Sequence, residues 1–201
     1  FQTNGLYITE EISNWIQVIP GKLDRHQHVT VLGGRPRLDK LRGLSLKDLD
    51  LLKKVCRPDL CLAKADGART RLFKAPGDHE PVVPAWTTHG MVVVNLHAIG
   101  LPLSEKYVHR PDRVAGLTGL QMNDPLTIST MAHVVSHPTT YLRAFPSGTN
   151  VFLYLSCCAD KPQRAQAEAI NNAIPVNTFA GVFCGDINRS QAAITTLRKS
   201  F

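Results

Sequence analysis

The chain has 201 residues and a formal net charge of +7, with 43% hydrophobic and 19% charged residues. A chain of this length can bury a proper core, as one large domain or two small ones. No segment approaches the roughly 20 apolar residues of a membrane span, so the composition excludes a membrane-spanning helix.

The basic charge and the sequence pI near 9.3 indicate anionic partners. The lysines and arginines are scattered, however, with local groups at 35–42 and 69–74. No aromatic residues interleave with them to stack on bases, which disfavours a nucleic-acid partner and fits a solvated basic surface.

Metal-ligating residue types are present but form weak patterns. His133 and His137 are four residues apart, a spacing typical of helical metal ligands, although His137 also belongs to a His-Pro helix stop. The cysteines are odd in number and follow no recognised zinc spacing: Cys56, Cys61, Cys157, Cys158 and Cys184. With no signal-peptide pattern at the start, this predicts reduced thiols in a cytoplasmic protein.

The first predicted elements alternate between strands and helices. Residues 29–32 predict a strand closed by Gly33 and Gly34, and Ser45 is a candidate N-cap for an amphipathic helix over 46–54. The apolar run Leu60–Ala63 predicts a buried strand that leads into Asp66.

The second half of the chain continues this alternation. Residues 91–94 form an uninterrupted apolar run, typical of a strand covered on both faces. The remaining patterns predict a helix over 128–136, a strand over 151–155, a helix over 162–173, a strand over 179–184 and a helix over 190–199. We therefore expect a single α/β domain over 1–201, with three layers and a mostly parallel sheet.

The segment around Asp66 has the densest group of functional residue types. If a strand ends just before it, Asp66 lies where open α/β sheets bind ligands and could hold Mg²⁺ directly or through water. Gly67 would let the backbone approach a phosphate, and three residues supply cations for an anionic ligand: Arg69, Arg71 and Lys74. The alternative is a structural turn, because Asp-Gly is a common turn dipeptide and Asp66 can cap its own turn.

Two further pairs are candidate site residues. His79 and Glu80 could act together in proton transfer or bind a metal, although neighbours on an extended segment point in opposite directions. His109 and Arg110 could form an anion clamp, since arginine can bind phosphate through two hydrogen bonds. The alternative for this pair is a segment that leads into a helix.

A nucleotide site on such a sheet normally has a glycine-rich phosphate loop between the first strand and the first helix. No G-x-x-x-x-G-K-[ST] motif is present, and Gly33-Gly34-Arg35 is too short, with no helix immediately after it. The chain therefore contains the second half of a phosphate site without the first.

Several motifs follow one another in a specific order. The longest is KADGARTRLFKAP at 64–76 followed by HEPVVP at 79–84; the others are GLS at 43–45, GLPL at 100–103, VHRPD at 108–112 and HP at 137–138. Over about 40–160 the chain resembles the YqeC-like accessory proteins of selenium-dependent molybdenum hydroxylases. Their central motif is close to E-A-D-G-A-x-x-R-P-L-K-A-P-x-x-H-E-P-V-I-P.

The resemblance implies a protein that helps to mature a molybdenum-selenium centre, with a P-loop NTPase-like fold that here lacks the N-terminal phosphate-loop segment. Either that segment precedes Phe1, or this is a truncated relative that cannot hydrolyse a nucleotide. The implied cofactors are Mg²⁺ with ATP or GTP, or the molybdenum cofactor, and the implied partners are the hydroxylase or its cofactor-maturation proteins. Asp160 would read a base, although only this aspartate remains of the relatives' Asn-Lys-x-Asp-like element. Lys64 replaces a glutamate and Leu72 a proline of the family motif.

Three functions follow from these patterns. The first is an accessory protein that binds a phosphorylated ligand at the loop after the Asp66 strand, with nucleotide hydrolysis expected only if a phosphate loop precedes residue 1. The second is a non-catalytic cofactor carrier or docking module, favoured by Lys64 and the missing loop. A general anion or nucleic-acid binder has only the charge in its favour.

Overall fold

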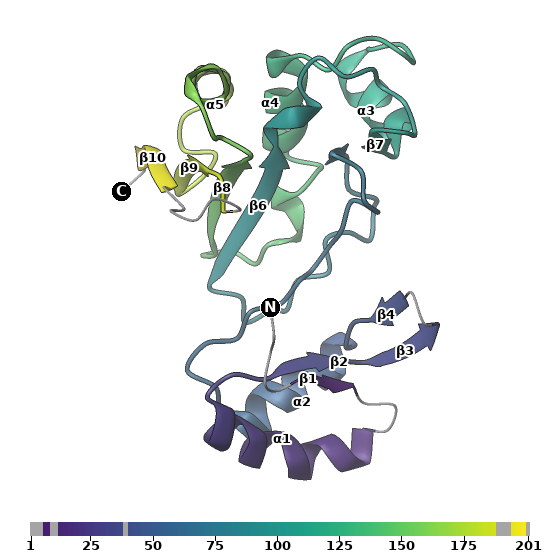
Figure 1. The fold of residues 1–201 in the computed structure, drawn as a ribbon, viewed down its shortest axis with the longest axis vertical. Coiled ribbons are helices and arrows are strands. Elements are labelled where there is room, and N and C mark those ends of the chain that lie inside the picture. Colours follow the sequence, from purple (N-terminus) through teal and green to yellow (C-terminus); the bar gives the residue numbers. More distant parts are fainter. Residues whose placement is uncertain (1–5, 9–11, 38–39, 188–193, 200–201) are drawn as a thin grey trace. The chain divides into compact units, whose positions relative to one another are not determined.

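The structure, a computed structural model, describes residues 6–8, 12–37, 40–187 and 194–199 (Figure 1). The chain divides into two compact units, Phe1–Ala63 and Lys64–Phe201, and each is described by itself. The expectation of a single domain over 1–201 stays a prediction.

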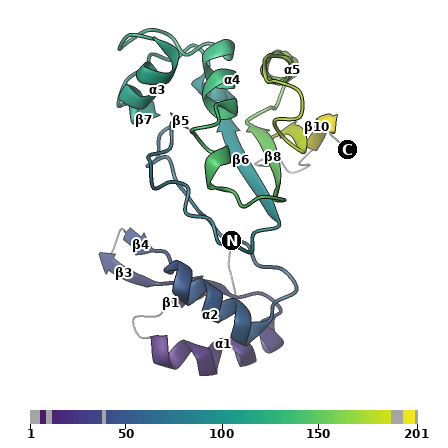
Figure 2. The same ribbon diagram turned by 180° about the vertical axis from the view of Figure 1, so that it is seen from behind.

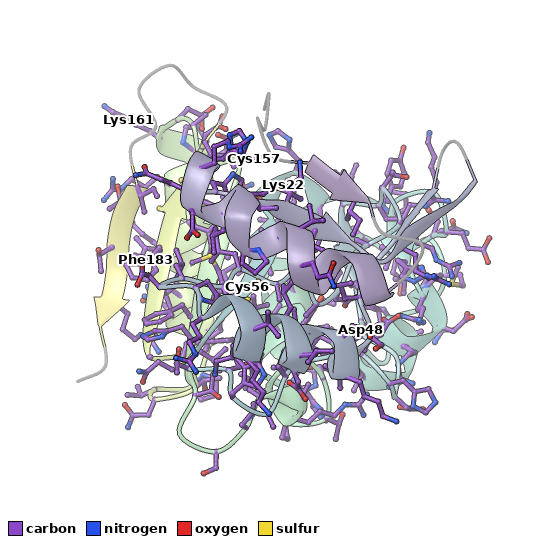
Figure 3. All side chains as sticks on the ribbon, turned by 90° about the horizontal axis from the view of Figure 1, so that it is seen from below. Lys22, Asp48, Cys56, Cys157, Lys161 and Phe183 are labelled. Carbon is purple, nitrogen blue, oxygen red and sulfur yellow. The ribbon has the colours of Figure 1, made fainter. Side chains whose placement is uncertain are left out.

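The N-terminal unit combines short strand pairs with helices that pack on each other. Its described elements are β1 (Leu6–Ile8), α1 (Ile12–His26), β2 (Thr30–Leu32), β3 (Gly34–Arg37), β4 (Lys40–Arg42) and α2 (Leu46–Cys56). β1 pairs with β2 in parallel, and β3 with β4 antiparallel. Figure 3 shows α1 and α2 side by side, with Lys22 on α1 and with Asp48 and Cys56 on α2.

The strand predicted at 29–32 and the helix predicted at 46–54 are both confirmed. Ser45 is the N-cap of α2, and its hydroxyl accepts a hydrogen bond from the Asp48 backbone N–H at 3.2 Å. The Asp48 carboxylate accepts one from the Ser45 N–H in return, at 3.4 Å. This reciprocal cap satisfies two N–H groups that the first helical turn leaves open.

The buried strand predicted at Leu60–Ala63 is wrong. No regular element covers 57–72, and the side chains of Leu60 and Leu62 are 73% and 85% exposed. A strand needs a hydrogen-bonded neighbour, and this run pairs with no other strand among the described residues. Asp66 therefore lies in a loop before β5 (Phe73–Lys74) rather than at the end of a strand.

The C-terminal unit carries the main sheet and core. Beyond β5 it contains β6 (His89–Asn95), η1 (Leu96–Ala98), β7 (Val108–His109), α3 (Pro111–Thr118), α4 (Ile128–Ser136), η2 (Leu142–Ala144), β8 (Asn150–Ser156), α5 (Lys161–Ala173), β9 (Gly181–Gly185) and β10 (Ile194–Lys199). The sheet order is β10-β9-β8-β6, with β6, β8 and β9 parallel and β10 antiparallel, while β5 and β7 form a separate parallel pair. The predicted mixed α/β class with mostly parallel strands is confirmed and is consistent with a three-layer fold.

The helix predicted over 190–199 is wrong where the structure describes it. Residues 194–199 form β10, which pairs antiparallel with β9, and 190–193 lie outside the described residues. Ile194, Thr195 and Thr196 are consecutive β-branched residues, which favour an extended backbone.

The core of this unit lies between the four-stranded sheet and its helices. Leu153 and Leu155 of β8 are fully buried, and they join Met131 of α4 and Ile170 of α5 in one apolar cluster. α4 and α5 pack against each other over the sheet, with α4 behind β6 in Figure 1 and in front of it in Figure 2.

The other face of β6 is open, so the expectation that residues 91–94 are covered on both faces is wrong. Val92 and Val94 are 3% exposed, whereas Met91 and Val93 are 59% and 58% exposed. Successive side chains of a strand point to opposite faces, and here the core covers one of them.

Candidate functional site

The parallel pair β5–β7 positions the site residues. Phe73 pairs with Val108 and both are buried in the core, which anchors the two short strands. Lys74 and His109 are the next pair and the last residue of each strand. The predicted location, at the carboxyl ends of parallel strands, therefore applies to this pair rather than to a strand before Asp66.

Lys74 lies at the centre of a buried ion-pair network. Its side chain is 5% exposed, and its ammonium group donates to Asp66 Oδ1 at 2.6 Å and to Glu80 Oε2 at 2.7 Å. A third hydrogen bond reaches the Gly67 carbonyl at 3.1 Å. An ammonium group has three N–H donors, so these three acceptors use all of them.

Arg110 completes the network from the start of α3. Its guanidinium group binds the Glu80 carboxylate through two hydrogen bonds, at 2.5 and 2.9 Å. The hydrogen bond from Arg110 is the main cause that lowers the pKa of Glu80 far below its ordinary value, and the hydrogen bond from Lys74 lowers it further. Partial burial raises this pKa but does not outweigh the two hydrogen bonds. Glu80 is therefore an anion at neutral pH and not a proton donor. We call Asp66, Lys74, Glu80 and Arg110 the Lys74 network.

Backbone contacts hold the network in place. The Gly67 N–H donates to Asp66 Oδ1 at 2.6 Å, so Asp66 also caps its own turn. Tyr141 donates its hydroxyl to the Lys74 carbonyl at 2.9 Å. Lys64, which replaces the family's glutamate, donates to the backbone carbonyl of Asp66 at 2.9 Å.

A Mg²⁺ ion at Asp66, as predicted, would have to compete with the Lys74 ammonium group. Lys74 lies against both Asp66 oxygens and shares Glu80 with Arg110, while Asp66 Oδ2 is buried and has no hydrogen-bond partner among the described residues. Within the described part of the chain, no three His, Cys, Asp or Glu side chains are grouped to hold a metal ion. His133 and His137 lie together, with ring centroids 5.2 Å apart, but without a third such ligand.

The structure places the other predicted site residues around the network or away from it. Arg69 and Arg71 are exposed, and Arg71 is held by a 2.6 Å hydrogen bond to the Glu105 carbonyl. His109 is half-buried. Burial is the main cause that lowers its pKa, and the positive charge of Arg110 lowers it further, so the neutral ring is favoured at pH 7. His79 is exposed and lies outside the network.

Asp160 takes part in another structure. Its carboxylate accepts a hydrogen bond from the Gln163 backbone N–H at 2.9 Å and so caps α5, after β8. It is not among the residues of the Lys74 network.

The cysteines form no disulfide. Burial is the main cause that raises the pKa of Cys184 to about 12, and a hydrogen bond with Cys158 is the second cause. All five cysteines are free thiols.

Three charged residues of the site were not predicted from the sequence. The Asp78 carboxylate accepts from Arg113 at 2.9 Å and lies 3.5 Å from Arg143. Arg113 follows Arg110 by about one helical turn, and this spacing could have indicated that it belongs to the same site. For Arg143 no sequence signal exists, because the Gly77 carbonyl that it contacts is 66 residues away.

Replacing Glu80 with glutamine should weaken the acid dependence of stability. A carboxylate with a lowered folded-state pKa stabilises the fold fully above its unfolded pKa of about 4.3, and this contribution is lost as the pH falls below that value. We expect the free energy of unfolding, measured between pH 7 and pH 3, to fall less steeply below about pH 4.3 in Glu80→Gln than in the wild type. The exposed Glu105→Gln is the control, and equal slopes for wild type and Glu80→Gln would refute the assignment.

Comparison with known proteins places these residues in a family. The model of the YqeC protein family matches residues 5–112, a span that contains the Lys74 network and more than half of the chain. The chain belongs to the YqeC family. The predicted family resemblance is therefore confirmed.

One curated relative supports this membership. The protein named "Uncharacterized protein YqeC" from Escherichia coli (strain K12) is 26% identical over 153 residues. The alignment covers 76% of this chain and 60% of that protein, so the chain spans about 60% of the length of its relative. No solved structure matches the chain. Across the described residues, no helix has both the length and the apolar character needed to cross a bilayer.

Proposed function

We propose that this YqeC-family chain is a cytoplasmic accessory protein in the maturation of a selenium-dependent molybdenum hydroxylase. In this proposal it binds a phosphorylated ligand, either a nucleotide (ATP or GTP) or the molybdenum cofactor, beside the Lys74 network. The partner would be the hydroxylase or one of its cofactor-maturation proteins. Family membership supports the accessory role, and the arrangement of charges supports the ligand class.

The observation that carries the chemical part is the buried Lys74 ammonium between Asp66 and Glu80. Hydrolysis of a nucleotide with Mg²⁺ needs carboxylates that are free to hold the metal or orient water. Here both carboxylates are already neutralised by cations of the chain itself. The geometry therefore favours the carrier or docking mode, in which the ligand is held without turnover.

The cations available to a ligand lie at the rim of this network. Arg69 and Arg71 are exposed on the loop before β5, and the guanidinium group of Arg71 is oriented by Glu105. Neutral His109 adds a hydrogen-bonding ring next to Lys74 in the strand register. Arginine side chains at a partly exposed rim can bind phosphate oxygens through charge-assisted hydrogen bonds.

Removing both rim arginines should weaken binding of the phosphorylated ligand. We expect the dissociation constants for ATP or GTP, measured by isothermal titration calorimetry, to rise at least about tenfold in Arg69→Ala/Arg71→Ala, because two charge-assisted hydrogen bonds are lost. Arg25→Ala, which removes an exposed arginine of α1, should bind as the wild type does.

Measurements on the wild-type protein distinguish the carrier mode from nucleotide hydrolysis. Failure of the wild type to bind either nucleotide at millimolar concentration would refute a nucleotide as the ligand and leave the molybdenum cofactor. Release of phosphate from ATP or GTP with Mg²⁺, abolished by Asp66→Asn, would refute the carrier mode in favour of hydrolysis. Binding without phosphate release is the result that we expect.

A further inference from the structure

A second group of charges lies beside the Lys74 network, around the turn from Gly77 to Glu80. The turn is closed by a 3.0 Å hydrogen bond from the Glu80 N–H to the Gly77 carbonyl. Asp78 lies at its tip with a side chain that is 71% exposed. Arg113, on α3, and Arg143, on η2, both reach the same oxygen of Asp78, Oδ1.

Arg143 is held by a part of the fold other than Asp78. Arg143 donates to the Gly77 carbonyl at 2.5 Å through Nη2, which leaves Nη1 directed at Asp78. Arg113 lies in the first turn of α3, next to the fully buried Val114. The Nε atom of Arg113 is buried and has no hydrogen-bond partner. The Gly77 carbonyl thus holds the Arg143 guanidinium group independently of Asp78, and the Nη atoms that reach Asp78 become free for another anion if Asp78 moves away.

Asp78 is a weak partner for this pair. One of its oxygens serves both guanidinium groups, at 2.9 and 3.5 Å, and its exposure to water screens the interaction. A phosphate group offers three oxygens and can bind arginine through two parallel hydrogen bonds. A phosphate group would therefore make more hydrogen bonds to this pair than the carboxylate does.

The pair is continuous with the site described above. Arg110 packs against Gly77, because a Cβ atom added to Gly77 would lie 3.1 Å from the Cζ atom of Arg110. Arg110 binds both oxygens of Glu80, whereas Arg113 and Arg143 share a single oxygen of one exposed carboxylate. Of these three arginines around one turn, two are therefore available for exchange.

From this geometry we infer that Arg113 and Arg143 form the subsite for a phosphate group of the ligand, and that Asp78 occupies this subsite until the phosphate displaces it. The inference rests on the proposed binding of a phosphorylated ligand and adds how that site is regulated. Asp78 acts as an internal competitor, so binding requires the Gly77–Glu80 turn to release it. The hydrogen bond and charge of Arg113 lower the pKa of Asp78, which keeps this competitor ionised.

The test compares Asp78→Asn with the wild type in the full chain, using inorganic pyrophosphate as the probe in calorimetric titrations. We expect Asp78→Asn to bind pyrophosphate about tenfold more tightly, because the amide keeps the shape of the side chain but no longer competes. Asp112→Asn is the matched control: it removes the same charge one residue from Arg113, and Asp112 is exposed and makes no ion pair with any described residue. Its affinity should change less than about twofold.

A double variant links the gain to the arginines. In Asp78→Asn/Arg143→Gln the tighter binding should be lost, with an unchanged circular dichroism spectrum as the check on folding. An unchanged affinity in Asp78→Asn, an equal gain in Asp112→Asn or a gain that persists without Arg143 would each overturn the inference. If the wild type binds ATP or GTP but Asp78→Asn gains nothing, only this inference fails. If neither protein binds pyrophosphate or nucleotide, the proposed binding of a nucleotide fails with it.

Discussion

Replacing Lys74 with methionine should lower the free energy of unfolding by about 3 to 5 kcal/mol. Methionine keeps a similar length and apolar stem, so the change removes mainly the charge. Asp66 and Glu80 would then lie partly buried without the ammonium group that they share, at 16% and 28% side-chain exposure. Removing one partner of a buried ion pair is costly because the remaining charge loses a counter-ion at a position where water replaces it only in part.

Urea denaturation at pH 7 measures this effect, with Lys161→Met as the matched control because Lys161 is an exposed lysine at the start of α5. The control should change the free energy of unfolding by less than about 0.5 kcal/mol. A loss below about 1 kcal/mol in Lys74→Met would show that water, and not Lys74, compensates the two carboxylates.

A second substitution should recover part of the loss. Glu80 keeps Arg110 as a partner in Lys74→Met, whereas the described ion pairs of Asp66 involve Lys74 alone. Adding Asp66→Asn removes the unpaired charge, so the double variant should be more stable than Lys74→Met. Additive losses would mean that the two residues do not interact in solution.

The second large effect is expected in the core. Leu153→Ala should lower the free energy of unfolding by about 2 to 5 kcal/mol, because Leu153 is fully buried in the apolar cluster under α4 and α5. The substitution removes buried methyl groups and leaves a cavity that close-packed neighbours fill only in part.

Met91→Ala is the control for this prediction. Met91 is of similar size and lies in the same sheet, on β6, but 59% of it is exposed on the open face. It should cost less than about 1 kcal/mol. Equal losses for the two variants, measured by urea denaturation, would mean that the open face of β6 is covered in solution and that the strand is buried on both sides.

Much of the fold was predictable from the sequence because its signals are local. Ser45 with Asp48, and Thr127 before Ile128, are caps whose hydrogen bonds lie within a few residues of the helix start. The apolar run at 151–155 became β8 as predicted. The predictions failed at 60–63 and 194–199, where a short apolar or β-branched run acquires its structure from a partner strand. Residues 60–63 have no such partner among the described residues, and residues 194–199 pair with β9.

For the site, the sequence by itself determined which residue types lie close along the chain. Asp66, Gly67, Lys74 and Glu80 fall within one motif, and the structure brings all four together with Arg110. Only the tertiary structure decided what they do there. The register of β5 with β7 brings Arg110 to Glu80, and burial makes Lys74 a counter-ion for two carboxylates instead of a free cation. The charge of a side chain can be read from its type, but its partners depend on strands and helices that are distant in sequence, which is also why Asp78, Arg113 and Arg143 emerged only in the fold.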